Sequence, residues 1–403
     1  MAASAPDELR ALTRLAFDEL GGATGGIGQL HQAIADRAFG AAGSQASPSR
    51  IAHDAISRGV YAGLRGATTL AGRAAAGVVS GGGRPLSTTP RGAAVLAVIN
   101  GLRGDALERE GSELHQPMAV RVGGEVVGPD DLEAAFPDAG PSVVVFLHGL
   151  FETEFSWRLG GGETYGERLA REAGFTPVDV RYNSGRHISE NGRSLADLLE
   201  AVIAAWPVDV ERIALVGHSM GGLVARSACC HGAERGDGWV RLVRHTVTLG
   251  SPHMGAPLEQ AVHYASAALG AVPETRPFAG FLRRRSAGIR DLRQGSLVDE
   301  DWHGRDPDAL RAAACKEVPL LEGATHHFVA ATVTSSAEHP VGRLVGDWLV
   351  LHPSASGRSR SRRIPFREED GLHVGGTHHL ALLNHPAVYE RLREWLAPAP
   401  QRG

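Results

Sequence analysis

Short runs of apolar, β-branched residues alternate with amphipathic stretches along most of the chain after residue 140. We predict strands in the runs "SVVVFLHG" (142–149), "TPVDVRYN" (176–183), "RIALVGH" (212–218), "RHTVTLGS" (244–251) and "HHFVAATVT" (326–334). Their apolar residues are continuous rather than alternating, which is typical of strands buried on both faces. The pattern therefore predicts an α/β fold with a mostly parallel central sheet and helices on both faces.

The first part of the chain has a different pattern. Amphipathic helical spacing covers residues 6–20, 27–40, 47–78 and 91–109, with glycine clusters between them. The segment "PMAVRVGGEVVG" then places alternating apolar residues around a Gly-Gly pair, as in a β-hairpin. We therefore expect a helical N-terminal region at 1–115 and a catalytic domain at 116–403. The interval from Ser251 to Thr325 lacks strand signals and carries helical patterns, which predicts a helical cap at about 252–325.

Composition narrows the classes of partner. The chain has 41 basic and 45 acidic residues, so its overall charge does not favour binding to nucleic acid.

The N-terminus lacks the layout of a secretory signal, and no stretch meets the length of a membrane span, so we expect a cytoplasmic protein. The amphipathic N-terminal helices permit peripheral membrane contact, although core-packed or solvated helices are the favoured interpretation. We expect the three cysteines to be buried and to pack as small apolar residues. The sequence gives no indication of the oligomeric state.

The segment "VGHSMGG" places Ser219 in a G-x-S-x-G pattern with Gly217 and Gly221. A serine hydroxyl becomes a strong nucleophile only beside a base and hydrogen-bond donors for the oxyanion. The pattern puts serine on a sharp strand-to-helix turn, where the glycines prevent clashes. Because "RIALV" precedes it and "GGLVARSACC" follows, we predict Ser219 as the nucleophile; a structural turn is the alternative.

A second turn follows the strand that ends in "FLHGL". Gly149 allows the backbone to turn so that an N–H group aims at the reacting oxygen. We propose the N–H groups of Leu150 and Met220 as the oxyanion hole, the latter at a helix N-terminus. His148 and His218 flank these turns and are expected to have structural hydrogen-bonding roles rather than to act as the base.

From about residue 140 to 398 the chain resembles the α/β-hydrolase fold, and within it bacterial lipases and the GPI inositol-deacylase-like serine hydrolases. The resemblance rests on "FLHGL", "VGHSMGGLVAR", "TLGSPHMGAPL", "VGDWLVLHPSASG" and "HHLALLNHPAVYERLREWL". It implies a triad in the order Ser, acid, His, with the acid after a late strand and the His before the last helix.

That order implies the two remaining triad residues. Asp347 lies in a segment similar to the Gly-Asp-Gly-Leu-Val acid loop of the lipases, with Trp348 in place of the second Gly; Asp370 is the rival acid. The ending "HHLALL" implies His379 as the base, with His378 as the alternative.

We expect a serine carboxylic-ester hydrolase that acts on a small-molecule or lipid acyl ester through an acyl-enzyme, without a cofactor. Acyl transfer, thioester or polyester cleavage would use the same triad, and a non-catalytic binding module is the alternative of another class. The tail histidines His373, His378, His379 and His385 lack the spacing of a zinc motif, so no metal is expected.

Overall fold

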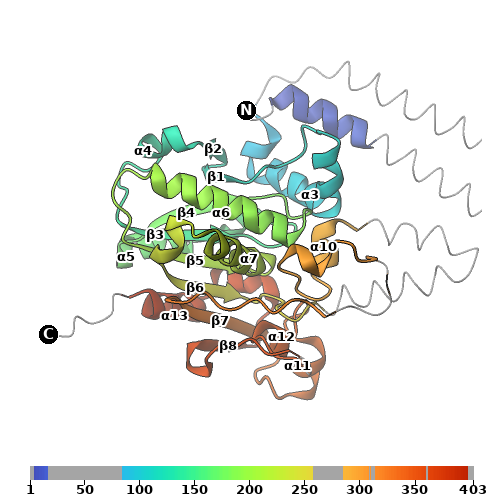
Figure 1. Ribbon diagram of the computed structural model, residues 1–403, viewed down its shortest axis with the longest axis vertical. Helices are drawn as coiled ribbons and strands as arrows, with labels where there is room; N and C mark the ends of the chain where they lie inside the picture. The colour runs from blue at the N-terminus through green and yellow to red at the C-terminus, as the bar shows by residue number, and fades with distance from the viewer. Residues whose placement is uncertain are drawn as a thin grey trace, which may run out of the picture. The chain divides into compact units, whose positions relative to one another are not determined.

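The computed structural model describes residues 4–16, 84–256, 285–307, 309, 314–359 and 362–397. Their contacts divide the chain into two compact units. In the first, residues 5–16 are helical. The second comprises Ser87–Arg109, His115–Gln260 and Ser286–Gly403 and contains the sheet (Figure 1). The division of the chain near residue 115 stays a prediction.

The sheet has eight strands in the order β2-β1-β4-β3-β5-β6-β7-β8. Strands β1 and β2 form the expected antiparallel hairpin, β1 pairs antiparallel with β4, and the remaining pairs are parallel. Their bounds are β1 Ala119–Val122, β2 Glu125–Val127, β3 Ser142–Leu147, β4 Thr176–Arg181, β5 Arg212–His218, β6 Val243–Leu249, β7 Thr325–Thr332 and β8 Gly371–Gly375. The predicted mostly parallel sheet is confirmed.

Successive residues of β3 face two separate cores. Val143 and Val145 pack with the α6 and α7 side, whereas Val144 and Phe146 pack with the α5 and α13 side. Because side chains alternate across a strand, a strand with helices on both faces must be apolar at every position. The continuous apolar run in the sequence therefore has a direct structural cause.

Helices cover both faces of the sheet, with α6 and α7 side by side on one of them (Figure 1). The longer helices are α3 Pro90–Arg109, α5 Tyr165–Ala173, α6 Ile188–Ala204, α7 Met220–Arg235 and α13 Pro386–Leu396. Shorter ones are α4 Leu132–Ala135, α10 Ala287–Asp291, α11 Pro340–Val345 and α12 His352–Ala355. The 3-10 turns are η2 Leu86–Thr88, η3 Pro129–Asp131, η4 Glu154–Arg158, η5 Gly238–Leu242, η6 Asp299–Asp301, η7 Glu368–Asp370 and η8 His379–Asn384.

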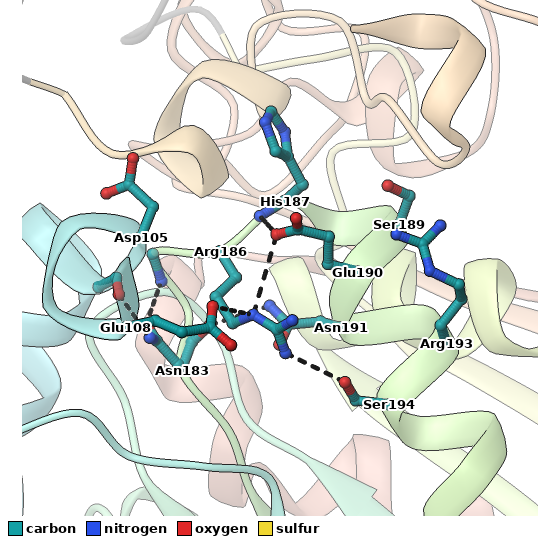
Figure 2. Close-up of polar contacts among 12 residues, drawn as sticks. Asp105, Glu108, Asn183, Arg186, His187, Ser189, Glu190, Asn191, Arg193 and Ser194 are labelled. Carbon is teal, nitrogen blue, oxygen red and sulfur yellow. Dashed lines mark hydrogen bonds and ion pairs between the residues drawn. The ribbon is translucent and has the colours of Figure 1, made fainter. Parts of the chain in front are cut away.

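Helix α3 is fastened to the loop between β4 and α6 by polar contacts (Figure 2). Asn183 Nδ2 donates to the carbonyl of Gly104 at 2.9 Å. Arg186 pairs with Glu108 at 2.6 Å and donates to Ser194 Oγ at 3.0 Å. The predicted helix at 91–109 thus packs against the sheet domain and holds the loop after β4 in place.

Several expectations fall partly outside the described residues. The expected helices at 27–40 and 47–78 lie outside them, as do most of the cap helices. Within the described part of the cap interval, α10 is the one α-helix, and residues 314–317, expected to end a helix, have no regular structure. Cys229 is buried as expected, but Cys230 and Cys315 are half-buried. Among the described helices, none is both long and apolar enough to cross a bilayer.

Candidate active site

Ser219 occupies a strained turn between β5 and α7. Its backbone angles are φ 52° and ψ −119°, in a region that residues with a side chain rarely adopt. A Cβ on Gly217 would overlap the backbone of Gly221 and Gly222, and one on Gly221 would overlap the carbonyl of Leu147. The turn therefore needs glycine at both places named by the G-x-S-x-G pattern.

The turns after β3, β5 and β6 meet at the carboxyl edge of the sheet. A Cβ on Gly149 would lie 3.0 Å from Ser219 Cβ, so the turn after β3 touches the serine. The N–H of Ser219 donates to the carbonyl of Leu249 at 2.8 Å. Parallel strands bring their carboxyl ends to one edge, where α/β proteins bind ligands.

The backbone N–H groups of residues 149–151 differ in their hydrogen-bond partners. That of Gly149 donates to Glu152 Oε2 at 2.7 Å, and that of Phe151 approaches Ser184 Oγ at 3.4 Å. The N–H groups of Leu150 and Met220 have no acceptor within the described parts of the chain. Met220 begins α7, so its N–H lies at the positive end of that helix. These two donors are the ones that the sequence analysis proposed for the oxyanion hole.

His148 holds the turn after β3 through both ring nitrogens. The N–H of Tyr182 donates to His148 Nε2 at 3.2 Å, which leaves Nδ1 to donate to the carbonyl of Gly149 at 2.8 Å. Burial lowers the pKa of His148 to about 4, so the ring is neutral near pH 7. This pattern matches the expected hydrogen-bonding role.

The structure brings Asp347 and His379 into direct contact. His379 Nδ1 lies 2.7 Å from Asp347 Oδ2, and the N–H of His379 donates to the carbonyl of Asp347 at 2.9 Å. The other carboxylate oxygen accepts from the N–H groups of Leu349 and Val350 at 3.0 and 2.7 Å. Both side chains are buried, at 1% and 3% exposure. Two N–H groups of its own loop thus hold the Asp347 carboxylate in place independently of its contact with the imidazole.

Residues 249 and 250 connect the serine to this pair. Leu249 accepts the N–H of Ser219, and a Cβ on Gly250 would lie 3.1 Å from His379 Nδ1. The serine backbone and the histidine ring therefore border adjacent residues at the end of β6.

The rival residues lie elsewhere. His378 is exposed, while its neighbour His379 faces Asp347. Asp370 precedes β8 at the opposite end of that strand and pairs with Arg367 at 3.2 Å. His385 caps α13 by accepting the N–H of Ala387, as expected of a residue at the start of a helix.

His218 contacts a residue that the sequence analysis did not single out. Its Nδ1 lies 2.9 Å from Glu152 Oε1, and its Nε2 lies 3.2 Å from the carbonyl of His379. Glu152 stands in "HGLFETEF", two positions before a second acidic residue, Glu154, and only the tertiary contact distinguishes it. Among the described residues, no group of three potential metal ligands occurs.

Strained backbone conformations occur in three of the segments that form the candidate site. In the described chain, positive φ at a residue other than glycine occurs at Phe151, Ser219 and Trp348, which have φ of 64°, 52° and 85°. They lie in the turn after β3, at the turn before α7, and next to Asp347. Such strain costs on the order of 1–3 kcal/mol per residue and concentrates at functional sites.

Residues 142–302 match the family model described as a PGAP1-like alpha/beta domain. The predicted resemblance is thereby confirmed for this segment, and with the sheet topology it establishes the α/β-hydrolase fold. No curated protein is significantly similar in sequence.

Similar solved structures include lipases and esterases. The mature lipase BlEst2 of Bacillus licheniformis is 18% identical, with a TM-score of 0.42 over 65% of this chain and 94% of that one. An esterase of Pyrobaculum calidifontis is 17% identical, with a TM-score of 0.35 over 64% and 73%. EstE1, a thermophilic carboxylesterase cloned from a metagenomic library, is 15% identical, with a TM-score of 0.37 over 64% and 82%.

The strain at Ser219 predicts a difference in stability between two variants that both lack the hydroxyl. Glycine adopts positive φ freely, whereas alanine keeps the steric cost of a Cβ. Ser219→Gly should therefore be more stable than Ser219→Ala by about 1 kcal/mol in urea unfolding. Equal urea midpoints and equal slopes of the unfolding free energy for the two variants would contradict the claim that the backbone of Ser219 is strained.

Proposed function

We propose that this chain is a serine carboxylic-ester hydrolase of the lipase or esterase type. Ser219 is the nucleophile, His379 the base and Asp347 the acid of its triad. The observation that carries the proposal is the buried 2.7 Å contact between His379 Nδ1 and Asp347 Oδ2. An imidazole whose Nδ1–H donates to a carboxylate has Nε2 available to accept a proton.

In the first half of the reaction, His379 Nε2 accepts the proton of Ser219 Oγ as Oγ bonds to the ester carbonyl carbon. The carbonyl oxygen gains negative charge and accepts hydrogen bonds from the N–H groups of Leu150 and Met220. The tetrahedral intermediate then collapses, the bond to the alcohol oxygen breaks, and His379 gives its proton to the leaving alcohol. Asp347 stabilises the charged imidazole throughout.

In the second half, water replaces the alcohol. His379 takes a proton from the water as its oxygen attacks the acyl-enzyme carbonyl. Collapse of this second intermediate breaks the bond to Ser219 Oγ, which recovers its proton from His379. The carboxylic acid leaves, and the enzyme returns to its starting protonation state.

A panel of p-nitrophenyl esters of increasing acyl length, measured with wild type and Ser219→Ala, tests this proposal. Removal of the nucleophile should lower kcat/KM by at least about 10³-fold on every ester that wild type cleaves. The circular dichroism spectrum should not change, because Ser219 is a small side chain at a turn. Substantial hydrolysis by Ser219→Ala would overturn the proposal.

The adjacent pair His378 and His379 provides a matched comparison for the base. His379→Ala should lose activity to about the same extent as Ser219→Ala, because members of a triad act as a unit. His378→Ala should stay within about threefold of wild type, since an exposed side chain without a partner in the triad contributes little to the transition state. The reverse order of effects on kcat/KM would assign the base to His378.

A further inference from the structure

We propose that Glu152 and His218 form a buried ion pair that positions both the oxyanion-hole turn and the loop of His379. This inference rests on the proposed function, because it assigns supporting residues to the same site. The polar contacts of the two side chains are with each other, with the N–H of Gly149 and with the carbonyl of His379, so both are positioning residues. They join the turn after β3, the end of β5 and the segment after β8.

Glu152 determines which N–H group of its turn is available to substrate. Its Oε2 accepts the N–H of Gly149 at 2.7 Å, and its own N–H donates back to the carbonyl of Gly149 at 3.3 Å. With the N–H of Phe151 directed at Ser184, the N–H of Leu150 remains without an acceptor among the described residues. The carboxylate thus closes a small turn that presents one donor to the site.

His218 has an acceptor at each ring nitrogen. Its Nδ1 lies 2.9 and 3.0 Å from Oε1 and Oε2 of Glu152, and its Nε2 lies 3.2 Å from the carbonyl oxygen of His379. A carboxylate and a carbonyl can only accept, so both nitrogens must carry a proton for both contacts to be hydrogen bonds. The geometry therefore requires the charged imidazolium, and a neutral ring would lose one of its two partners.

The ion pair is almost entirely enclosed by the domain. The side chain of His218 is 0% exposed and that of Glu152 is 9% exposed. The ring centroids of Trp157 and His379 lie 6.4 and 4.7 Å from that of His218. A charge in such surroundings is stable only when it is paired, so each member depends on the other.

The surrounding charges agree with this state. Burial opposes the charge on His218, but the Glu152 carboxylate, with a smaller contribution from Asp347, holds the pKa of His218 above its ordinary value. Burial likewise opposes ionisation of Glu152, yet His218 and the N–H of Gly149 keep the pKa of Glu152 below its ordinary value. Of the other titratable neighbours of Glu152, His148 has a pKa of about 4 and is neutral near pH 7, and burial raises the pKa of Tyr182 well above its ordinary value.

The test compares Glu152→Gln with Glu154→Gln, two residues along the same loop. Glu154 is also buried and paired, with Arg181, but it contacts neither Gly149 nor His218. Glu152→Gln should lower kcat about 10- to 100-fold, because small displacements of catalytic groups cost rate in that range. Glu154→Gln should keep kcat within about twofold, even if it lowers stability to the same extent. Equal effects on kcat would reduce Glu152 to a structural residue.

The pH profile adds a measurement that general destabilisation would not move. His218 has a raised pKa, so the ion pair is intact below the ordinary histidine pKa and is lost as pH rises through the raised value. Glu152 has a lowered pKa, so at the acid end the pair is lost as pH falls through that lowered value. Without the carboxylate, burial, which is the largest influence on His218 and opposes its charge, is countered only by the His379 carbonyl and Asp347, so the pKa of His218 falls. The alkaline decrease in kcat should therefore begin at lower pH in Glu152→Gln than in Glu154→Gln, and coincident profiles would overturn the proposal.

Nitrogen-15 NMR of the imidazole groups in wild type reads the charge without relying on a variant. At pH 6.5, the ordinary histidine pKa, one buried ring should have both nitrogens protonated, and its signals should be absent in His218→Asn. A neutral His218 would contradict the ion pair. Failure of this inference is distinct from failure of the proposed function, since an inactive Ser219→Ala beside a fully active Glu152→Gln would reject only the ion pair.

Discussion

The turn at Ser219 depends on the absence of side chains at Gly217 and Gly221. With a hydrogen at each place, the end of β5 and the start of α7 approach so closely that a Cβ would overlap backbone atoms. This approach forces Ser219 to positive φ and places it at the carboxyl edge of the sheet. Every other proposed catalytic contact is arranged around that fixed point, because β3, β6 and β8 end at the same edge.

The loops that meet at this edge of the sheet are held in place by different interactions. Asp347 is fixed by the N–H groups of its own loop, while His379 is oriented by Asp347 on its ring and by His218 on its carbonyl. The turn after β3 is held by His148 and Glu152. Preorganisation of this kind matters because donors already in place stabilise developing charge without reorganisation during the reaction. The strained backbone at Ser219 and beside Asp347 shows that packing outweighs local preference in these segments.

Much of this arrangement could be predicted from the sequence. The strands of the parallel sheet follow from continuous apolar runs, and Ser219 follows from a strand and a helix on either side of its glycines. The sequence indicates Asp347 and His379 only through the resemblance to lipases, because a single acid or histidine in a loop has no periodic signal. Trp348 stands where that loop has glycine, and the structure gives it the positive φ that glycine would adopt.

Glu152 lay beyond sequence reasoning for a physical reason. Its partner His218 is 66 residues away, and the carbonyl that His218 contacts is 161 residues further along the chain. A buried ion pair arises only when the segments that bear its members are assembled, so no local pattern distinguishes this acid from its neighbours.

The central claim is that Ser219 is an activated nucleophile, and labelling with a fluorophosphonate tests it most directly. The account predicts rapid loss of ester hydrolysis with one equivalent of label per chain, located by peptide mass spectrometry on Ser219. The folded protein with His379→Ala should label far more slowly. Folded wild type that stays unlabelled, or label located on another serine, would contradict the account.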